Sequence, residues 1–158
     1  MDVRFLGHAC FELSDGDTKV LIDPFLTGNP QAAVSADELD PATILVSHGH
    51  ADHTGDVLSI ATRTGAPVVA STELAHEFAE DGAQALDVNL GGTATFDWGS
   101  VKLVPALHDS RTPKGGSNLP AGLVIDFNGT VVYHLGDTAL FSDLQLVGRR
   151  QPIDVALM

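Results

Sequence analysis

Two patterns of hydrophobic and polar residues run along this chain of 158 residues. The first consists of short apolar runs, rich in β-branched residues and bounded by glycine, proline or aspartate, which is typical of β-strands. Asp15 and Gly16 form a turn signal between two of these runs. The runs predict strands at residues 2–7, 10–15, 19–24, 43–47, 67–71, 85–89, 93–98, 100–108, 121–127, 130–137 and 153–158.

The second pattern has apolar residues at helical spacing and predicts three helices, at residues 57–65, 72–82 and 139–150. Gly65 and Gly82 end the first two of these patterns and are typical residues at the end of a helix. Strands mixed with amphipathic helices indicate sheets covered by helices, so we predict a protein of the α/β (α+β) class. The length of the chain fits a single domain that spans residues 1–158.

The composition is that of a globular protein, since 44% of the residues are hydrophobic. No apolar run is long enough to cross a membrane. The first residues lack the charged and apolar regions of a signal peptide, and we therefore expect a cytoplasmic protein. The single cysteine, Cys10, excludes an internal disulfide and an all-cysteine zinc site. We expect Cys10 to be a small core residue.

The formal net charge of −13 has two interpretations. One is a solvated acidic surface, as in a protein from a salt-adapted organism. The other is that some of the carboxylates hold cations, which would lower the effective charge. Neither interpretation leaves a broad basic surface for nucleic acid. We therefore expect neither nucleic acid nor a membrane as a partner.

The stretch from His48 to His53, with the sequence HGHADH, holds four potential metal ligands within six positions. A lone histidine more often caps a helix or packs in a core. Several such groups buried together are costly without a cation. This stretch also follows a predicted buried strand, which places the chain firmly. The cluster therefore indicates metal binding.

The spacing within this stretch divides its ligands into two sets. His48 and His50 are two residues apart, so in an extended segment their imidazoles face the same side and can bind one ion. Asp52 and His53 follow after the chain has turned and can point toward a second ion. Imidazole with carboxylate favours Zn²⁺, with Mn²⁺ or Fe as alternatives. Two metal ions about 3.5–4 Å apart can together support a hydrolytic reaction.

The HGHADH stretch resembles the H-x-H-x-D-H signature of the metallo-β-lactamase superfamily. More narrowly, the chain is similar to uncharacterised metal-dependent hydrolases of that superfamily, near the ascorbate-6-phosphate lactonase branch. The matching stretches include GHACFEL, LIDPFLTGNP, ILVSHGHADHTGD, PALHDS and IDVALM, in the same order. The resemblance implies an αββα sandwich, incomplete at its C-terminal end. It also implies an enzyme that uses a metal-bound hydroxide on a small-molecule ester, lactone or phosphorylated substrate.

The resemblance further implies a centre of two metal ions, expected to be Zn²⁺. The ligands are His48, His50 and His108 for the first ion, Asp52 and His53 for the second, and Asp137 of the GDT turn as a bridge. Asp52 and Asp137 are the candidate catalytic residues. Both His108 and Asp137 end predicted apolar strands, where a loop can present them at the edge of a sheet.

Four further residues are candidates for supporting roles. The resemblance places Asp23 close to the site, where it would orient a ligand histidine, and an ordinary turn aspartate is the alternative. His8 either lies near the pocket or is a satisfied strand histidine. Arg111 and Lys114 lie in the loop 109–120, where they would meet an anionic group of the substrate or remain solvated loop charges.

Members of the family continue beyond the last residue of this chain and supply another histidine to the second ion. The other histidines do not match it, and we expect His134 to be packed and His76 to lie exposed on a helix. The resemblance therefore predicts a truncated chain that binds the first ion more tightly than the second. It also predicts an uncovered apolar surface that favours a homo-oligomer. A phosphodiesterase or nuclease of the same superfamily and an inactive metal-binding fragment remain as alternatives.

Overall fold

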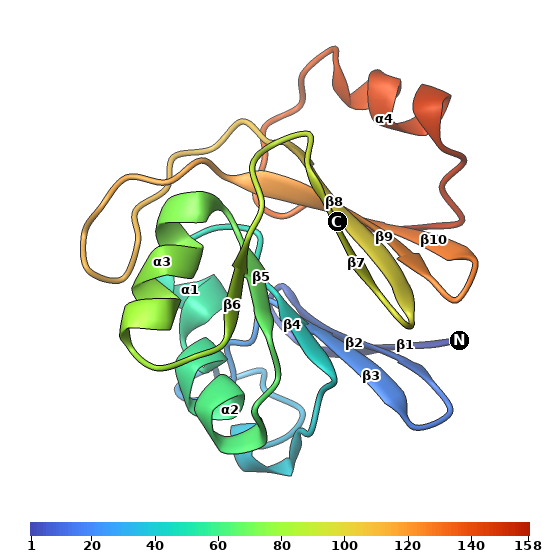
Figure 1. The fold of residues 1–158 in the computed structure, drawn as a ribbon. Helices are drawn as coiled ribbons and strands as arrows, with labels where there is room; N and C mark the ends of the chain where they lie inside the picture. Colours follow the sequence, from blue (N-terminus) through green and yellow to red (C-terminus); the bar gives the residue numbers. More distant parts are fainter.

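The computed structural model describes residues 1–158 and contains two β-sheets that face each other (Figure 1). The strands of the first sheet follow one another in the order of the sequence, β1 to β6. The pairs from β1 to β3 are antiparallel, and those from β3 to β6 are parallel. These strands are β1 (Asp2–Gly7), β2 (Cys10–Asp15), β3 (Thr18–Ile22), β4 (Thr43–Leu45), β5 (Val68–Ala70) and β6 (Ala85–Asp87).

The second sheet has the strand order β11-β10-β9-β8-β7. Strands β7 to β10 form antiparallel pairs, and β11 pairs with β10 in parallel. These strands are β7 (Thr93–Phe96), β8 (Gly99–Pro105), β9 (Ala121–Phe127), β10 (Thr130–His134) and β11 (Val155–Leu157).

Helices cover the outer faces of both sheets. In Figure 1, α1, α2 and α3 lie against the first sheet, and α4 lies against the second. The bounds are α1 (Ala51–Thr54), α2 (Val57–Thr64), α3 (Thr72–Glu80) and α4 (Leu144–Arg150), with a short 3-10 helix at Ala36–Glu38. This arrangement is the predicted αββα sandwich, so the fold class is confirmed. None of the helices is long and apolar enough to span a membrane.

The hydrophobic core has two main layers, and alternation along the strands divides residues between them. Val20 and Ile22 of β3 belong to the layer between the two sheets, where they join Leu103 and Phe127. The intervening Leu21 points to the other face and belongs to the layer beneath the helices. Successive strand residues point to opposite faces, and in β3 both faces are buried. The run VLI at residues 20–22 is apolar without alternation for this reason.

Two predicted strands of the second sheet are longer than the structure shows. The strand predicted at 100–108 ends at Pro105, and the one predicted at 130–137 ends at His134. The chain therefore leaves the sheet after β8 shortly before His108, and after β10 shortly before the GDT turn.

The helix predicted at 139–150 begins only at Leu144. The backbone N–H of Ala139 donates a hydrogen bond to the carbonyl of Leu107 (2.9 Å), which ties this segment to the loop after β8. Leu140 is 93% exposed, so the apolar residues at the start of the predicted helix do not reach the core. By contrast, α2 ends as predicted, because Gly65 takes a left-handed conformation after it (φ 77°).

Candidate metal centre

The candidate metal centre lies where strands of the two sheets end near each other. The HGHADH stretch follows β4 and runs into α1, while His108 and Asp137 lie on the loops that follow β8 and β10. His8 lies in the turn between β1 and β2, and Asp23 directly follows β3. The structure thus brings together all six residues predicted to bind metal, namely His48, His50, Asp52, His53, His108 and Asp137.

A first set of donors consists of His48, His50 and His108, whose ligand atoms all lie within 4.8 Å of one another. Nε2 of His48 lies 3.0 Å from Nδ1 of His50. The ring of His108, from the opposite sheet, lies edge-on to both other rings. Burial lowers the pKa of His48 to about 4, so its imidazole is neutral near physiological pH and has a lone pair for a cation.

A second set consists of His48, His53 and Asp137. Oδ1 of Asp137 lies 3.4 Å from Nε2 of His53, and Oδ2 lies 3.6 Å from Nε2 of His108. The two oxygens of Asp137 thus face two different sets of imidazoles, which is the arrangement needed in a carboxylate that bridges two ions.

Nε2 of His53 is the strongest sign that the residues fit a metal ion. This atom is buried and has no hydrogen-bond partner, although buried polar atoms are nearly always paired. Burial opposes protonation of His53, but its hydrogen bond with Asp23 and the charges of the neighbouring carboxylates together outweigh burial and raise the pKa of the imidazole. Metal ions displace protons from such ligands. A divalent cation at Nε2 would satisfy the atom and neutralise the nearby carboxylates.

A third set consists of His8, Asp52 and His53. Nε2 of His8 lies 3.2 Å from Oδ2 of Asp52, and the rings of His8 and His53 are 5.2 Å apart. Of the two predicted positions of His8, the structure thus shows the one beside the candidate metal ligands.

Asp23 lies beneath the candidate ligands in the protein interior and forms hydrogen bonds with residues around them. Its carboxylate is fully buried and accepts hydrogen bonds from the backbone N–H and the hydroxyl of Ser47, at 2.7 and 2.6 Å. It also contacts Nδ1 of His53 (2.8 Å) and Nε2 of His134 (2.9 Å). Burial alone would raise the pKa of Asp23, but hydrogen bonds from His134 and His53 hold it well below its usual range. The contact between Asp23 and Nδ1 of His53 is the one that the role predicted for Asp23, orienting a ligand histidine, requires.

Sequence reasoning missed the contributions of Ser47 and Asp56 and the partner of His134. His134 is buried, as expected, but it also holds Asp23. Asp56 accepts hydrogen bonds from the backbone N–H groups of Leu26 and Thr27 (2.6 and 2.9 Å), and so fixes the loop beyond Asp23. Ser47 and Asp56 flank the HGHADH stretch in the sequence, and this closeness could have indicated that they contribute to the site.

Gly49 explains how the loop 109–120 closes over the centre. A Cβ on Gly49 would clash with the carbonyl oxygen of Arg111, so only glycine lets this loop pass. Arg111 is exposed beside the centre. The ammonium of Lys114 instead forms ion pairs with Asp81 (2.8 Å) and Glu80 (3.2 Å), at the end of α3. The predicted contact of Lys114 with substrate has no counterpart in this arrangement and stays a prediction.

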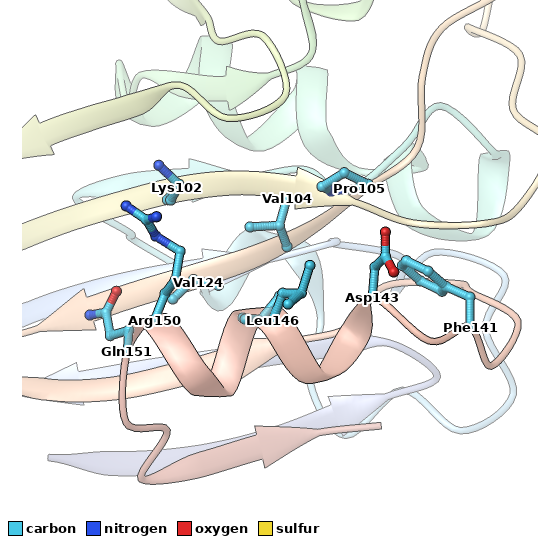
Figure 2. Close-up of a pocket in the computed structure, with 10 residues that line it drawn as sticks. Lys102, Val104, Pro105, Val124, Phe141, Asp143, Leu146, Arg150 and Gln151 are labelled. Atoms are coloured by element: carbon cyan, nitrogen blue, oxygen red, sulfur yellow. The ribbon is translucent and has the colours of Figure 1, made fainter.

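The largest cavity of the protein lies away from this centre, between α4 and the outer face of the second sheet (Figure 2). It has a volume of about 470 Å³, and Val104, Val124 and Leu146 are among the residues that line it. None of the predicted metal ligands lines this cavity. The chemistry indicated by the sequence therefore belongs to the strand ends and not to the largest hollow.

Comparisons with known proteins give consistent results. Residues 18–158 match a family model described as a beta-lactamase superfamily domain. A UPF0173 metal-dependent hydrolase of Natranaerobius thermophilus is 42% identical over 158 residues, which cover 100% of this chain and 70% of that protein. A UPF0173 metal-dependent hydrolase of Thermoplasma volcanium is 46% identical, with 100% of this chain and 71% of that protein covered.

A solved structure has the same fold. Igni18, described as a metallo hydrolase from the archaeon Ignicoccus hospitalis, superposes with a TM-score of 0.87 and 30% sequence identity. The match covers 99% of this chain and 69% of that one.

Proposed function

This chain belongs to the β-lactamase superfamily, and within it to the UPF0173 metal-dependent hydrolases. From this premise we propose that it hydrolyses a small ester, lactone or phosphorylated substrate, and that the reaction takes place at a centre of two divalent metal ions. The observation that carries the proposal is the overlap of the three donor sets: the set of His48, His53 and Asp137 shares His48 with the first set and His53 with the third. Such an overlap suits two neighbouring ions better than one.

The residues divide between the ions by their position. His48, His50 and His108 would hold the first ion, Asp52 and His53 the second, and Asp137 both. Bound ions supply Lewis-acid chemistry, since they polarise the group under attack and lower the pKa of a water molecule so that it can serve as the nucleophile. Imidazole and carboxylate donors favour Zn²⁺, with Mn²⁺ or Fe as alternatives.

The chain's own residues orient the site and move protons. Asp23, held by Ser47 and His134, fixes the ring of His53 through its Nδ1. The side chain of Asp52 is 48% exposed, so its carboxylate reaches both the centre and solvent. Asp52 can therefore accept a proton from the attacking water and release it to solvent.

The substrate we propose is small and anionic or ester-like. The guanidinium of Arg111 is exposed on the loop beside the centre, where it can bind an anionic group. A net charge of −13 disfavours nucleic acid, and we propose a cytoplasmic location.

A substrate screen tests this function. The metal-free protein is assayed against lactone, thioester and phosphodiester substrates, before and after addition of Zn²⁺, Mn²⁺ or Fe²⁺. We expect turnover of one class that depends on added metal and is lost in His50→Ala. The matched control is His76→Ala, because His76 is exposed on α3 away from the centre.

Three results would count against the proposal. Turnover that survives complete removal of metal would exclude metal-dependent hydrolysis. Cleavage of phosphodiesters alone, weakening steeply with salt, would favour the nuclease alternative. Inactivity toward every class with metal bound would favour a non-enzymatic metal-binding module.

A further inference from the structure

We infer that His8 is a direct ligand of the second metal ion, beside Asp52 and His53; this inference rests on the two-ion centre of the proposed function. The family pattern assigns the second ion Asp52, His53, the bridging Asp137 and a histidine from beyond residue 158, and it does not include His8. The structure brings a third side chain to these residues, from a turn far away in the sequence. Within residues 1–158, His8 gives the second ion three protein ligands besides the bridging Asp137, as the first ion has.

The donor atoms of the three side chains converge. His8, Asp52 and His53 each offer one ligand atom, and these atoms lie within 4.8 Å of one another. Nε2 of His8 lies 3.2 Å from Oδ2 of Asp52. Two imidazole nitrogens and a carboxylate oxygen form a donor set typical of Zn²⁺, which binds such atoms at about 2.0–2.2 Å.

The nitrogen that His53 offers is determined by its surroundings. Nδ1 of His53 is engaged by Asp23 at 2.8 Å. Nε2 is buried and has no hydrogen-bond partner. The rings of His8 and His53 lie 5.2 Å apart at an interplanar angle of 72°. A cation at this place would satisfy the unpaired nitrogen of His53 through its lone pair and would also be within reach of the imidazole of His8.

The backbone at His8 is held in a conformation that costs energy. His8 has φ 55°, which is uncommon for a residue other than glycine. The preceding Gly7 has φ 117°, and a Cβ on it would lie 2.7 Å from the carbonyl oxygen of Gln31. The turn is thus packed against the loop after β3. The ring of His8 also lies edge-on to Phe25. These contacts aim the imidazole at Asp52, and strain of this kind is concentrated at functional sites.

The competing explanation is that His8 only positions Asp52, through a hydrogen bond or ion pair. That contact is partly exposed, with side-chain exposures of 40% and 48%, and exposed pairs contribute little to stability. A positioning role would also require no approach of His8 to His53, yet the ligand atoms of His8, Asp52 and His53 all lie within 4.8 Å of one another. Direct ligation accounts for this convergence.

Counting bound metal in His8→Asn separates the two explanations. Asparagine tolerates a positive φ, so the turn should keep its conformation while the imidazole is removed. The matched control is His76→Asn on the exposed face of α3. Metal-free protein is dialysed against fixed concentrations of free Zn²⁺, and bound zinc per chain is measured by mass spectrometry of the metal.

We expect the wild-type protein and His76→Asn to bind two ions, the first more tightly. In His8→Asn the affinity for the second ion should fall at least about tenfold, while the first ion stays bound; changes to residues that merely support a metal ligand already cost about 10–100-fold. Long-range ¹H–¹⁵N NMR of the wild-type protein provides a readout that does not depend on a variant folding. The ring nitrogens of His8 should shift on addition of the second equivalent of Zn²⁺.

The outcomes distinguish the inference from the proposed function. If the wild-type protein and His8→Asn both bind two ions with the same affinities, the inference is wrong and the two-ion centre stands. Ring nitrogens of His8 that do not respond to the second equivalent would likewise overturn the inference alone. If the wild-type protein binds fewer than two ions, the two-ion centre fails, and the inference fails with it.

Discussion

The metal centre has a buried half and an exposed half, and the two are held in different ways. In the buried half, His48, His53 and Asp23 are fully buried; His53 contacts Asp23 directly, and Ser47 links His48 to Asp23. In the exposed half, the side chain of Asp137 is 39% exposed and lies 3.4–3.6 Å from its histidine neighbours. The fold therefore holds the side chains of the buried half in place without a metal ion. In the exposed half, a cation is needed to fix the carboxylate of Asp137 relative to its histidine neighbours.

The strongest test of this comparison is Asp23→Asn. The amide cannot accept all the hydrogen bonds that the carboxylate receives, so buried donors on Ser47, His53 and His134 lose their partner. We expect the free energy of unfolding to fall by roughly 3–5 kcal/mol, as when one partner of a buried charged network is removed. Urea denaturation measures it, with Asp97→Asn at an exposed position as the matched control. An unchanged unfolding midpoint would show that the buried half is not preorganised in this way.

Asp137→Asn should show the opposite behaviour. The side chain is partly exposed, so the free energy of unfolding of the metal-free protein should change by no more than about 0.5 kcal/mol. If Asp137 bridges two ions as proposed, its loss should lower metal-dependent turnover by at least about 100-fold, since the loss of groups that only support a ligand costs about 10–100-fold. Parallel measurements of turnover and urea denaturation check both parts. A large loss of stability without loss of turnover would reverse the comparison.

His134→Gln sharpens the comparison, because His134 belongs to the buried half but touches only Asp23 among the charged groups of the centre. Glutamine keeps a donor but not the shape of the ring. We expect a moderate loss of about 1–3 kcal/mol in unfolding free energy and a weaker hold on the ion bound by His53. Zinc competition with a chelator measures the second effect. Metal affinity equal to that of the wild-type protein would show that His134 packs without positioning Asp23.

The smallest effects are expected in the loop 109–120, and they distinguish its two cations. Arg111→Ala should raise the KM for an anionic substrate by about tenfold, since a charge-assisted hydrogen bond contributes about 1.5–3 kcal/mol. Lys114→Ala should leave KM unchanged, because the ammonium pairs with Asp81 and Glu80. Steady-state kinetics of both variants tests the difference. A raised KM in Lys114→Ala would restore the role that the sequence predicted for this lysine.

The sequence was most informative where a few neighbouring residues determine the structure. The apolar run before HGHADH predicts β4, and Gly65 ends α2 at the predicted place. The helix predicted at 139–150 failed in its first turn, because the hydrogen bond between Ala139 and Leu107 is a tertiary contact that no periodicity encodes.

The sequence by itself determined which residues are candidates for the chemistry of this centre, since the spacing of HGHADH decides which imidazoles face the same side. Only the tertiary structure decided how the centre is supported and completed. It joined His134 to Asp23 across 111 positions of the chain, and it carried His8 from the first turn to the side of Asp52. The physical reason is that ligand spacing within one stretch follows from backbone geometry. The meeting of five strand ends depends instead on how two sheets pack over a shared core.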